Sequence, residues 1–170
     1  MHIRLATVSD AEAITRVHYN AAHGLRPANF YTEDILNSWA PSPSAEHRIN
    51  RFRSIIESDK EVVVVAELDN KLIIGFGAII ISDHEIRALY IDPMYEHQGV
   101  GSKILQHLEE LALAQGVNIL KLEASLNAET FYIRHGYRVT QYDYHPLSSG
   151  GQMKCVKMSK QTTQTLENNE

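Results

Sequence analysis

Apolar residues recur at helical spacing over the first third of the chain. A short apolar strand at residues 3–6 is followed by apolar positions three and four residues apart, which predicts a helix that Gly24 ends. The same spacing predicts a second helix, capped by Thr32, and a third over residues 45–58. This part of the chain is therefore expected to be mainly helical.

From residue 61 the pattern changes to that of strands. Residues 61–67 contain a continuous β-branched run, which is typical of a central strand with both faces covered. Two more strand patterns, 72–81 and 85–91, follow across turn residues, so three antiparallel strands in series are the simplest interpretation. Gly75 and Gly77, inside the second strand, indicate a bulge or a close backbone approach.

The last part of the chain alternates between helices and strands. An amphipathic helix over 99–115 connects strand 85–91 to a strand at 117–124, and such a β-α-β unit places its two strands parallel. The remaining predicted elements are a short helix at 127–135 and two strands at 137–142 and 153–158. The sequence therefore predicts an α+β fold on a mixed sheet.

Composition narrows the class of protein. A chain of 170 residues fits one domain, and a net charge of −5 argues against non-specific nucleic-acid binding, which needs a basic surface. We expect no membrane association, because the apolar runs are too short to span a bilayer. Cys155 is the single cysteine and the start of the chain lacks a secretory signal, which favours a reducing cytoplasm.

Nine histidines raise the question of a metal site. No two of them share the i, i+4 spacing with an intervening glutamate that marks a helical zinc site. We therefore predict no metal.

A glycine turn stands between strand 85–91 and the following helix. The start of a helix has unpaired N–H groups and a partial positive charge, so it can bind phosphate, and Gly99 and Gly101 let a ligand approach the main chain. A dinucleotide-binding turn would need a third glycine where Ile104 stands. A kinase-type phosphate loop would need Gly-Lys-Ser/Thr, and Ser102 precedes the lysine here.

Two motifs in this order of elements resemble the GNAT superfamily of acyl-CoA-dependent N-acyltransferases. Gly99 and Gly101 match the family's Gln/Arg-x-x-Gly-x-Gly/Ala motif, while Glu96 departs from its first position. The stretch from Asn127 through Phe131-Tyr132 to Gly136-Tyr137 is similar to a second family motif. The resemblance implies a central, mostly antiparallel sheet in which the parallel pair splays apart, with helices on both faces. It implies one GNAT domain over 1–160, and the polar composition of residues 161–170 predicts a disordered tail.

The resemblance also implies a cosubstrate, acetyl-CoA, and residues that bind it. Backbone N–H groups would hold the pyrophosphate, the main chain at the end of strand 85–91 would pair with the pantetheine arm, and Asn127 would touch that arm. These cofactor-binding residues are Leu89, Tyr90, Ile91, His97, Gln98, Gly99, Val100, Gly101, Ser102 and Asn127.

By the same resemblance, Tyr132 is the catalytic acid and Glu85 the general base. A phenol stays protonated at neutral pH and can donate to a thiolate, and a carboxylate can deprotonate an ammonium directly or through water. Tyr132 could instead only pack beside Phe131, Glu85 could be a solvated turn residue, and His84 and Tyr90 are alternative bases.

The predicted reaction is acetyl transfer to a primary amine of a small molecule or peptide, by direct attack in a ternary complex. Cys155 is expected to be structural, and a homodimer is compatible with the family. The alternatives are a non-catalytic acyl-CoA-binding module and, less compatible with the acidic charge, a modifier of a nucleic-acid-bound substrate. By the same resemblance, acceptor specificity would come from Tyr19, His23, Phe30, Tyr31, Trp39, Tyr142, Tyr144 and His145, any one of which could instead only pack in the core or a lid.

Overall fold

A computed structural model describes residues 1–162 of the chain. Its helices are α1 (Ala11–Ala22), α2 (Leu25–Ala28), α3 (Glu33–Trp39), α4 (Glu46–Glu57), α5 (Val100–Ala114) and α6 (Glu129–Arg134). Short 3-10 turns, Val8–Asp10, Pro93–Tyr95 and Leu126–Ala128, precede α1, α5 and α6. The strands are β1 (His2–Leu5), β2 (Val62–Glu67), β3 (Ile73–Ile80), β4 (Glu85–Ile91), β5 (Ile119–Ser125), β6 (Arg138–Pro146) and β7 (Gln152–Gln161).

The strands form one seven-stranded mixed sheet in the order β1-β2-β3-β4-β5-β7-β6. Every neighbouring pair is antiparallel except β4 and β5, which are parallel. The predicted mixed, mostly antiparallel sheet is confirmed, and β2, β3 and β4 are the predicted antiparallel series.

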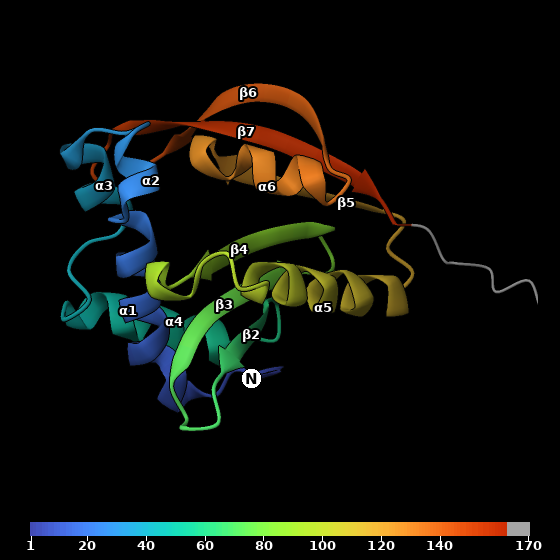
Figure 1. Ribbon diagram of the computed structural model, residues 1–170, viewed down its shortest axis with the longest axis horizontal. Coiled ribbons are helices and arrows are strands. Elements are labelled where there is room, and N and C mark those ends of the chain that lie inside the picture. Colours follow the sequence, from blue (N-terminus) through green and yellow to red (C-terminus); the bar gives the residue numbers. More distant parts are fainter. Residues whose placement is uncertain (163–170) are drawn as a thin grey trace, which may run out of the picture.

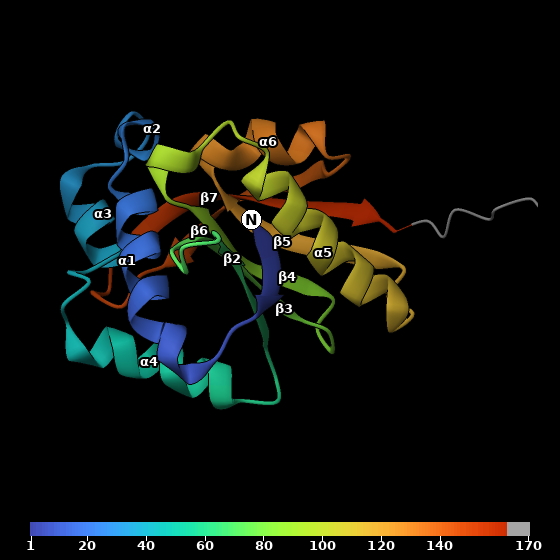
Figure 2. The same ribbon diagram turned by 60° about the horizontal axis from the view of Figure 1, so that its bottom comes forward.

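Both faces of the sheet are covered by helices, as expected. Alternate residues of β2 enter different cores: Val63 and Val65 pack with α1, and Val64 and Ala66 pack with the apolar face of α5. Figure 2 shows α1 and α4 on one side of the central strands and α5 on the other. The β-branched run therefore belongs to a strand buried on both faces.

The two glycines of β3 lie directly against side chains of α5 and β4. A Cβ added at Gly77 would lie 2.5 Å from Ile104 Cγ2, and one added at Gly75 would lie 2.8 Å from Ile91 Cδ1. The predicted close approach is thus made by α5 side chains and β4. It fixes the start of α5 beside the end of β4.

The parallel pair separates soon after it begins. Pairing between β4 and β5 is limited to Glu85 with Lys121 and Ile86 with Leu122. Figure 1 shows the sheet in two parts, β1–β4 below and β5–β7 above, which diverge from this point. The rest of β4 has a strand partner on its β3 side only.

Several predicted boundaries differ from the observed ones. Helix α1 ends at Ala22, and Gly24 instead caps the unpredicted short helix α2. Strand β6 continues to Pro146, and β7 continues to Gln161, since its pairing with β5 extends into the polar segment. The predicted tail lies, from residue 163, outside the described residues, and the division into domain and tail stays a prediction.

Among the described residues, no helix has both the length and the apolar character needed to cross a bilayer.

Candidate functional site

Two cavities meet where the sheet splits. The first, the splay cavity, has a volume of about 540 Å³ and lies between the end of β4, the start of α5, and α6. The second, the charged cavity, has a volume of about 270 Å³ and lies between α4, the body of β4, and β5–β7. Trp39, Tyr90 and Ser125 line both, so these side chains mark the junction.

The start of α5 presents a row of main-chain donors to the splay cavity. Gly99 is the N-cap residue at φ 78°, and His97 is also left-handed at φ 60°. Within the described chain, the N–H groups of residues 97–102 donate to no protein acceptor, whereas the next one, of Lys103, bonds to the Gly99 carbonyl. A Cβ at Gly99 would meet no atom within 4 Å, so the turn is open toward the cavity. This arrangement suits a phosphate group.

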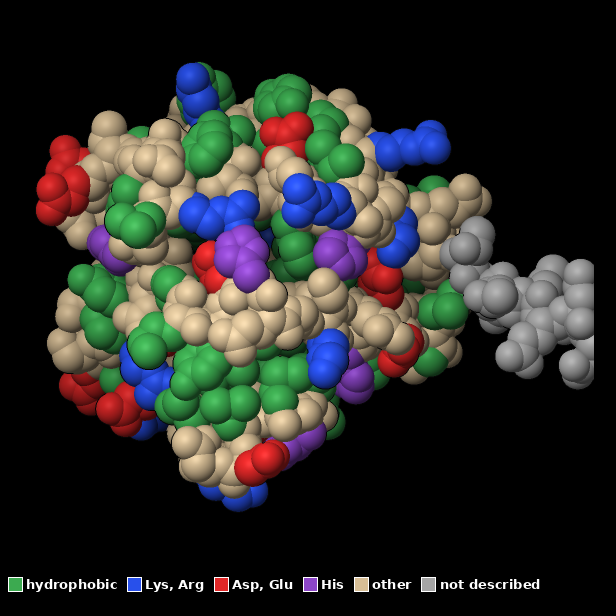
Figure 3. Space-filling model, viewed as in Figure 1, with side chains coloured by type: hydrophobic (Ala, Val, Ile, Leu, Met, Phe, Trp, Pro, Cys, Tyr) green, Lys and Arg blue, Asp and Glu red, His purple; other side chains and the backbone are tan. Residues whose placement is uncertain are grey.

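Cations and histidines surround this row of donors. Arg26, Arg134, His97 and His135 line the splay cavity. Figure 3 shows a groove across this face with Lys, Arg and His side chains along its upper edge. Glu96 also lines the cavity, with its carboxylate 3.9 Å from His97 Nε2. The neighbouring imidazole offers that acid a partner.

A histidine joins the start of α5 to α6. The Phe131 carbonyl lies 2.8 Å from His135 Nδ1 and must accept from it, so the neutral ring accepts at Nε2 from the Ser102 hydroxyl, 2.9 Å away. Ser102 thus offers a main-chain N–H to the cavity, and its side chain also binds His135 at the end of α6. The two motifs recognised in the sequence, around Gly99 and Phe131, face one cavity.

Polar groups of β4 and of Asn127 also line the splay cavity. Leu89, Tyr90 and Ile91 line it from β4, beyond the point where β5 has separated. Asn127 lines the other side, and its Oδ1 is buried without a hydrogen-bond partner. An orphaned buried acceptor beside an open strand edge fits a ligand with amide groups.

Tyr132 lies at the deep side of the splay cavity. Its side chain is buried, with its ring edge-on to those of Phe131 and Tyr137, and burial raises its pKa well above the usual phenol value. Burial likewise raises the pKa of Tyr90 to about 12. Both phenols are therefore protonated at neutral pH and can donate hydrogen bonds.

Glu85 faces the charged cavity, and not the splay cavity. Its Oε1 accepts a hydrogen bond of 3.0 Å from Arg87, and it stands at the start of β4, five residues before Tyr90. At about 3.3 Å per strand residue the Cα atoms of Glu85 and Tyr90 are roughly 17 Å apart. Any proton transfer to Glu85 from the junction would therefore run through water.

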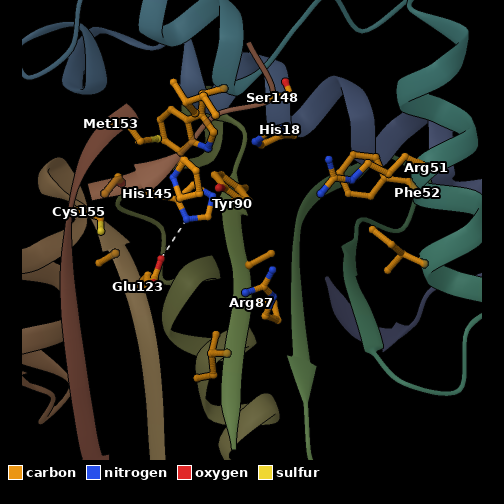
Figure 4. A pocket seen from close by; sticks show the side chains of 18 of the residues that line it. His18, Arg51, Phe52, Arg87, Tyr90, Glu123, His145, Ser148, Met153 and Cys155 are labelled. Carbon is orange, nitrogen blue, oxygen red and sulfur yellow. Dashed lines mark hydrogen bonds and ion pairs between the residues drawn. The ribbon is translucent and has the colours of Figure 1, made fainter. Parts of the chain in front are cut away.

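A second titratable pair lies in the same cavity. His145 Nδ1 donates to Glu123 Oε2 over 3.0 Å, which leaves Nε2 of the neutral ring as an acceptor. Figure 4 shows this pair on the strand side of the cavity, with Arg51 and Phe52 on α4 opposite. Burial raises the pKa of the Cys155 thiol in the same wall, so it stays a thiol and not a thiolate.

The predicted acceptor residues divide into three groups. Trp39 and His145 line the charged cavity. Tyr31 is a structural bridge: its hydroxyl accepts from Leu126 N–H and donates to the Lys154 carbonyl. Like Tyr31, the remaining five line neither cavity: Tyr19, His23, Phe30, Tyr142 and Tyr144.

Sequence reasoning missed several residues of the charged cavity. They are His18, Arg48, Arg51, Glu61, Arg87 and Glu123. The regular i, i+3 spacing of Arg48 and Arg51 on a predicted helix was the only available signal, and it is shared by ordinary solvated faces.

A family model and two curated proteins match this chain in sequence. A family model described as an acetyltransferase (GNAT) domain matches residues 59–139, which include β4, the glycine turn and α6. The peptidyl-lysine N-acetyltransferase YjaB of Salmonella typhimurium is 30% identical over 64% of this chain and 77% of its own length. The spermidine N(1)-acetyltransferase of Thermoplasma acidophilum is 22% identical, over 84% of this chain and 91% of its own.

Solved structures share the fold. A GCN5-related N-acetyltransferase from Rhodopseudomonas palustris superposes with a TM-score of 0.82 at 25% identity, covering 94% of both chains. The PaiA N-acetyltransferase of Thermoplasma acidophilum, solved in complex with coenzyme A, superposes with a TM-score of 0.72 at 21% identity, covering 95% of this chain and 99% of its own. The family model, the curated relatives and the shared fold agree, and the chain therefore belongs to the GNAT family of acetyltransferases.

Proposed function

We propose that this protein transfers the acetyl group of acetyl-CoA to a primary amine of a small molecule or peptide, by direct attack in a ternary complex. The observation that carries the proposal is the meeting of two cavities at Trp39, Tyr90 and Ser125. One cavity has the polar groups for a phosphorylated, amide-containing ligand, and the other has charged groups for an acceptor. A bisubstrate reaction needs this arrangement.

The residues of the splay cavity fit acetyl-CoA. The free N–H groups of residues 97–102 would hold the pyrophosphate, with Arg26 and Arg134 near the phosphates. The open edge of β4 at residues 89–91 would pair with the pantetheine amides, and Asn127 Oδ1 would gain the partner it lacks. When bound, acetyl-CoA supplies an acyl group on a thiolate leaving group.

Residues near the junction would stabilise the developing negative charge and transfer the protons. A main-chain N–H of residues 89–91 would donate to the carbonyl oxygen as negative charge develops on it. Tyr132 would donate its phenolic hydrogen bond toward the leaving sulfur. The attacking amine must lose a proton, and Glu85 would accept it through water, with the His145–Glu123 pair as a second acceptor in the same cavity. Cys155, a buried thiol, has no part in direct transfer.

Isothermal titration with acetyl-CoA tests the first half of the proposal, with NAD and free CoA as controls. We expect micromolar binding of acetyl-CoA and none of NAD. Absence of acetyl-CoA binding would leave only the fold in common with the cofactor-binding members of the family. Binding without turnover over a broad panel of amines would instead support the non-catalytic alternative.

A further inference from the structure

The charged cavity holds two arginines that form no ion pair among the described residues. Arg48 and Arg51 line it from α4, and in the described part of the chain neither forms an ion pair. The other charges in the cavity are largely matched, since Arg87 binds Glu85 and Glu123 binds His145. On the α4 wall, the charges of Arg48 and Arg51 are therefore not neutralised by an ion pair within the described residues, although Glu61 lines the same cavity.

Arg48 is held in place by a neutral group. Its Nη2 donates to His18 Nδ1 over 3.0 Å, and its guanidinium carbon lies 5.7 Å from the Phe52 ring centroid. Burial, together with the charge of Arg48, lowers the pKa of His18 to about 3, so the imidazole is neutral and accepts. His18 thus orients Arg48 without neutralising it.

Leaving a half-buried guanidinium unpaired is costly, because desolvation is offset only by the imidazole and ring contacts. Arg51 lies one helical turn further on and lines the same cavity from an exposed position. Glu61 also lines this cavity, where burial raises its pKa, and in the described chain it forms no ion pair with either arginine. A planar guanidinium group matches a carboxylate or phosphate geometrically.

The same wall is connected to the reaction site. The His18 ring lies 4.6 Å from that of Tyr90 and 6.0 Å from that of Trp39, centroid to centroid. Tyr90 and Trp39 are the junction residues, so Arg48 is one side chain removed from the place where the amine must attack. On the opposite wall are Glu123 and His145 (Figure 4), which suit an amine.

We propose that Arg48 and Arg51 bind an anionic group of the acceptor, so that the natural substrate is an amine that also carries a carboxylate or a phosphate-like group. This inference rests on the acetyl transfer proposed above and narrows its acceptor class. Polyamines and simple alkylamines, which offer no negative charge, fit this wall poorly.

Paired acceptors test the proposal. The kcat/KM for ω-amino acids and aminoalkylphosphonates of increasing length is measured beside that for alkylamines of the same length and for spermidine. We expect at least one anionic amine to exceed its alkylamine partner by about 10-fold or more, the usual worth of a charge-assisted contact. Equal values, or spermidine as the best acceptor, would overturn the inference while leaving acetyl transfer intact.

Variants on α4 assign the effect to its residues. Arg48→Gln is expected to reduce the ratio of kcat/KM for the anionic amine to that for its alkylamine by about 10- to 100-fold, mainly through KM. Arg51→Gln, at an exposed position, should reduce the same ratio and serves if Arg48→Gln does not fold. Arg53→Gln is the matched control, because Arg53 is on the same helix, is exposed, and binds Asn50 outside the cavity. An unchanged ratio in both cavity variants would contradict the proposal.

If no amine is acetylated, the binding of ω-amino acids still tests the anion site. The same ω-amino acids are titrated calorimetrically into protein saturated with free CoA, with wild type compared to Arg48→Gln. Tighter binding by wild type supports the anion site even though acetyl transfer has failed. Equal or absent binding at millimolar concentration in both overturns it.

Discussion

Asn127→Leu should make the protein more stable and the cofactor bind less well. The Asn127 Oδ1 atom is buried with no hydrogen-bond partner, and an unsatisfied buried acceptor costs about 1–3 kcal/mol. Leucine has nearly the same shape and no polar atom, so the substitution removes that cost in the free protein. For a chain of this size, about 1 kcal/mol changes Tm by roughly 2–4 °C, which gives an expected rise of about 2–12 °C.

The opposite change is expected for acetyl-CoA. With leucine at position 127, the pantetheine group that would bond to Oδ1 is buried without a partner, again at about 1–3 kcal/mol. The Kd for acetyl-CoA should rise by roughly 5- to 150-fold. Thermal unfolding of the free protein and calorimetric titration with acetyl-CoA measure the two effects independently.

The chain contains a matched control for this prediction. Tyr137 Oη is the other buried side-chain atom without a partner in the described chain, and Tyr137 lines neither cavity. Tyr137→Phe should therefore leave the acetyl-CoA Kd unchanged. A lower Tm for Asn127→Leu, or an unaltered Kd for acetyl-CoA, would contradict the role of Asn127 as a cofactor-binding residue.

Three further predictions concern catalysis and stability. Tyr132→Phe should lower kcat by about 100-fold or more while the acetyl-CoA Kd changes little, and an unchanged kcat would remove the phenol from the mechanism. Glu85→Gln should flatten the acidic limb of the pH–rate profile; if His145→Gln does so instead, the base is the histidine. Arg4→Gln should cost about 1–3 kcal/mol at pH 7, because Arg4 hydrogen-bonds the buried Asp10 carboxylate at 2.7 Å and lowers its pKa. That stabilisation is present above the unfolded pKa near ~4 and is lost as pH falls toward the lower folded pKa, so chemical unfolding should show the two proteins converging below about pH 4. A difference that persists at pH 2 would contradict this assignment.

Local signals predicted the fold well, because each element has its own pattern. The β-branched run of β2 and the apolar stripe of α5 were visible in the sequence. The glycine turn and the Phe131-Tyr132 pair could be found as motifs, and the structure brings both to one cavity. Helix α2 was missed because four residues show no period.

The charged cavity could not be predicted, because it depends on long-range contacts. Arg48 and His18 are thirty residues apart and meet only when α1 and α4 pack on the same face of the sheet. Glu123 and His145 lie on strands that are separated in the sheet by β7. Tyr31, which was predicted to line the acceptor pocket, instead joins the α2–α3 segment to β7 and to the 3-10 turn that follows β5.

The most direct test of acetyl transfer is to incubate the purified protein with acetyl-CoA and a panel of amines, and to follow CoA thiol release together with the mass of the products. We predict enzyme-dependent thiol release that requires an amine and is matched by an equal amount of N-acetylated product. Binding of acetyl-CoA with no amine-dependent release on any member of the panel would contradict the proposed function.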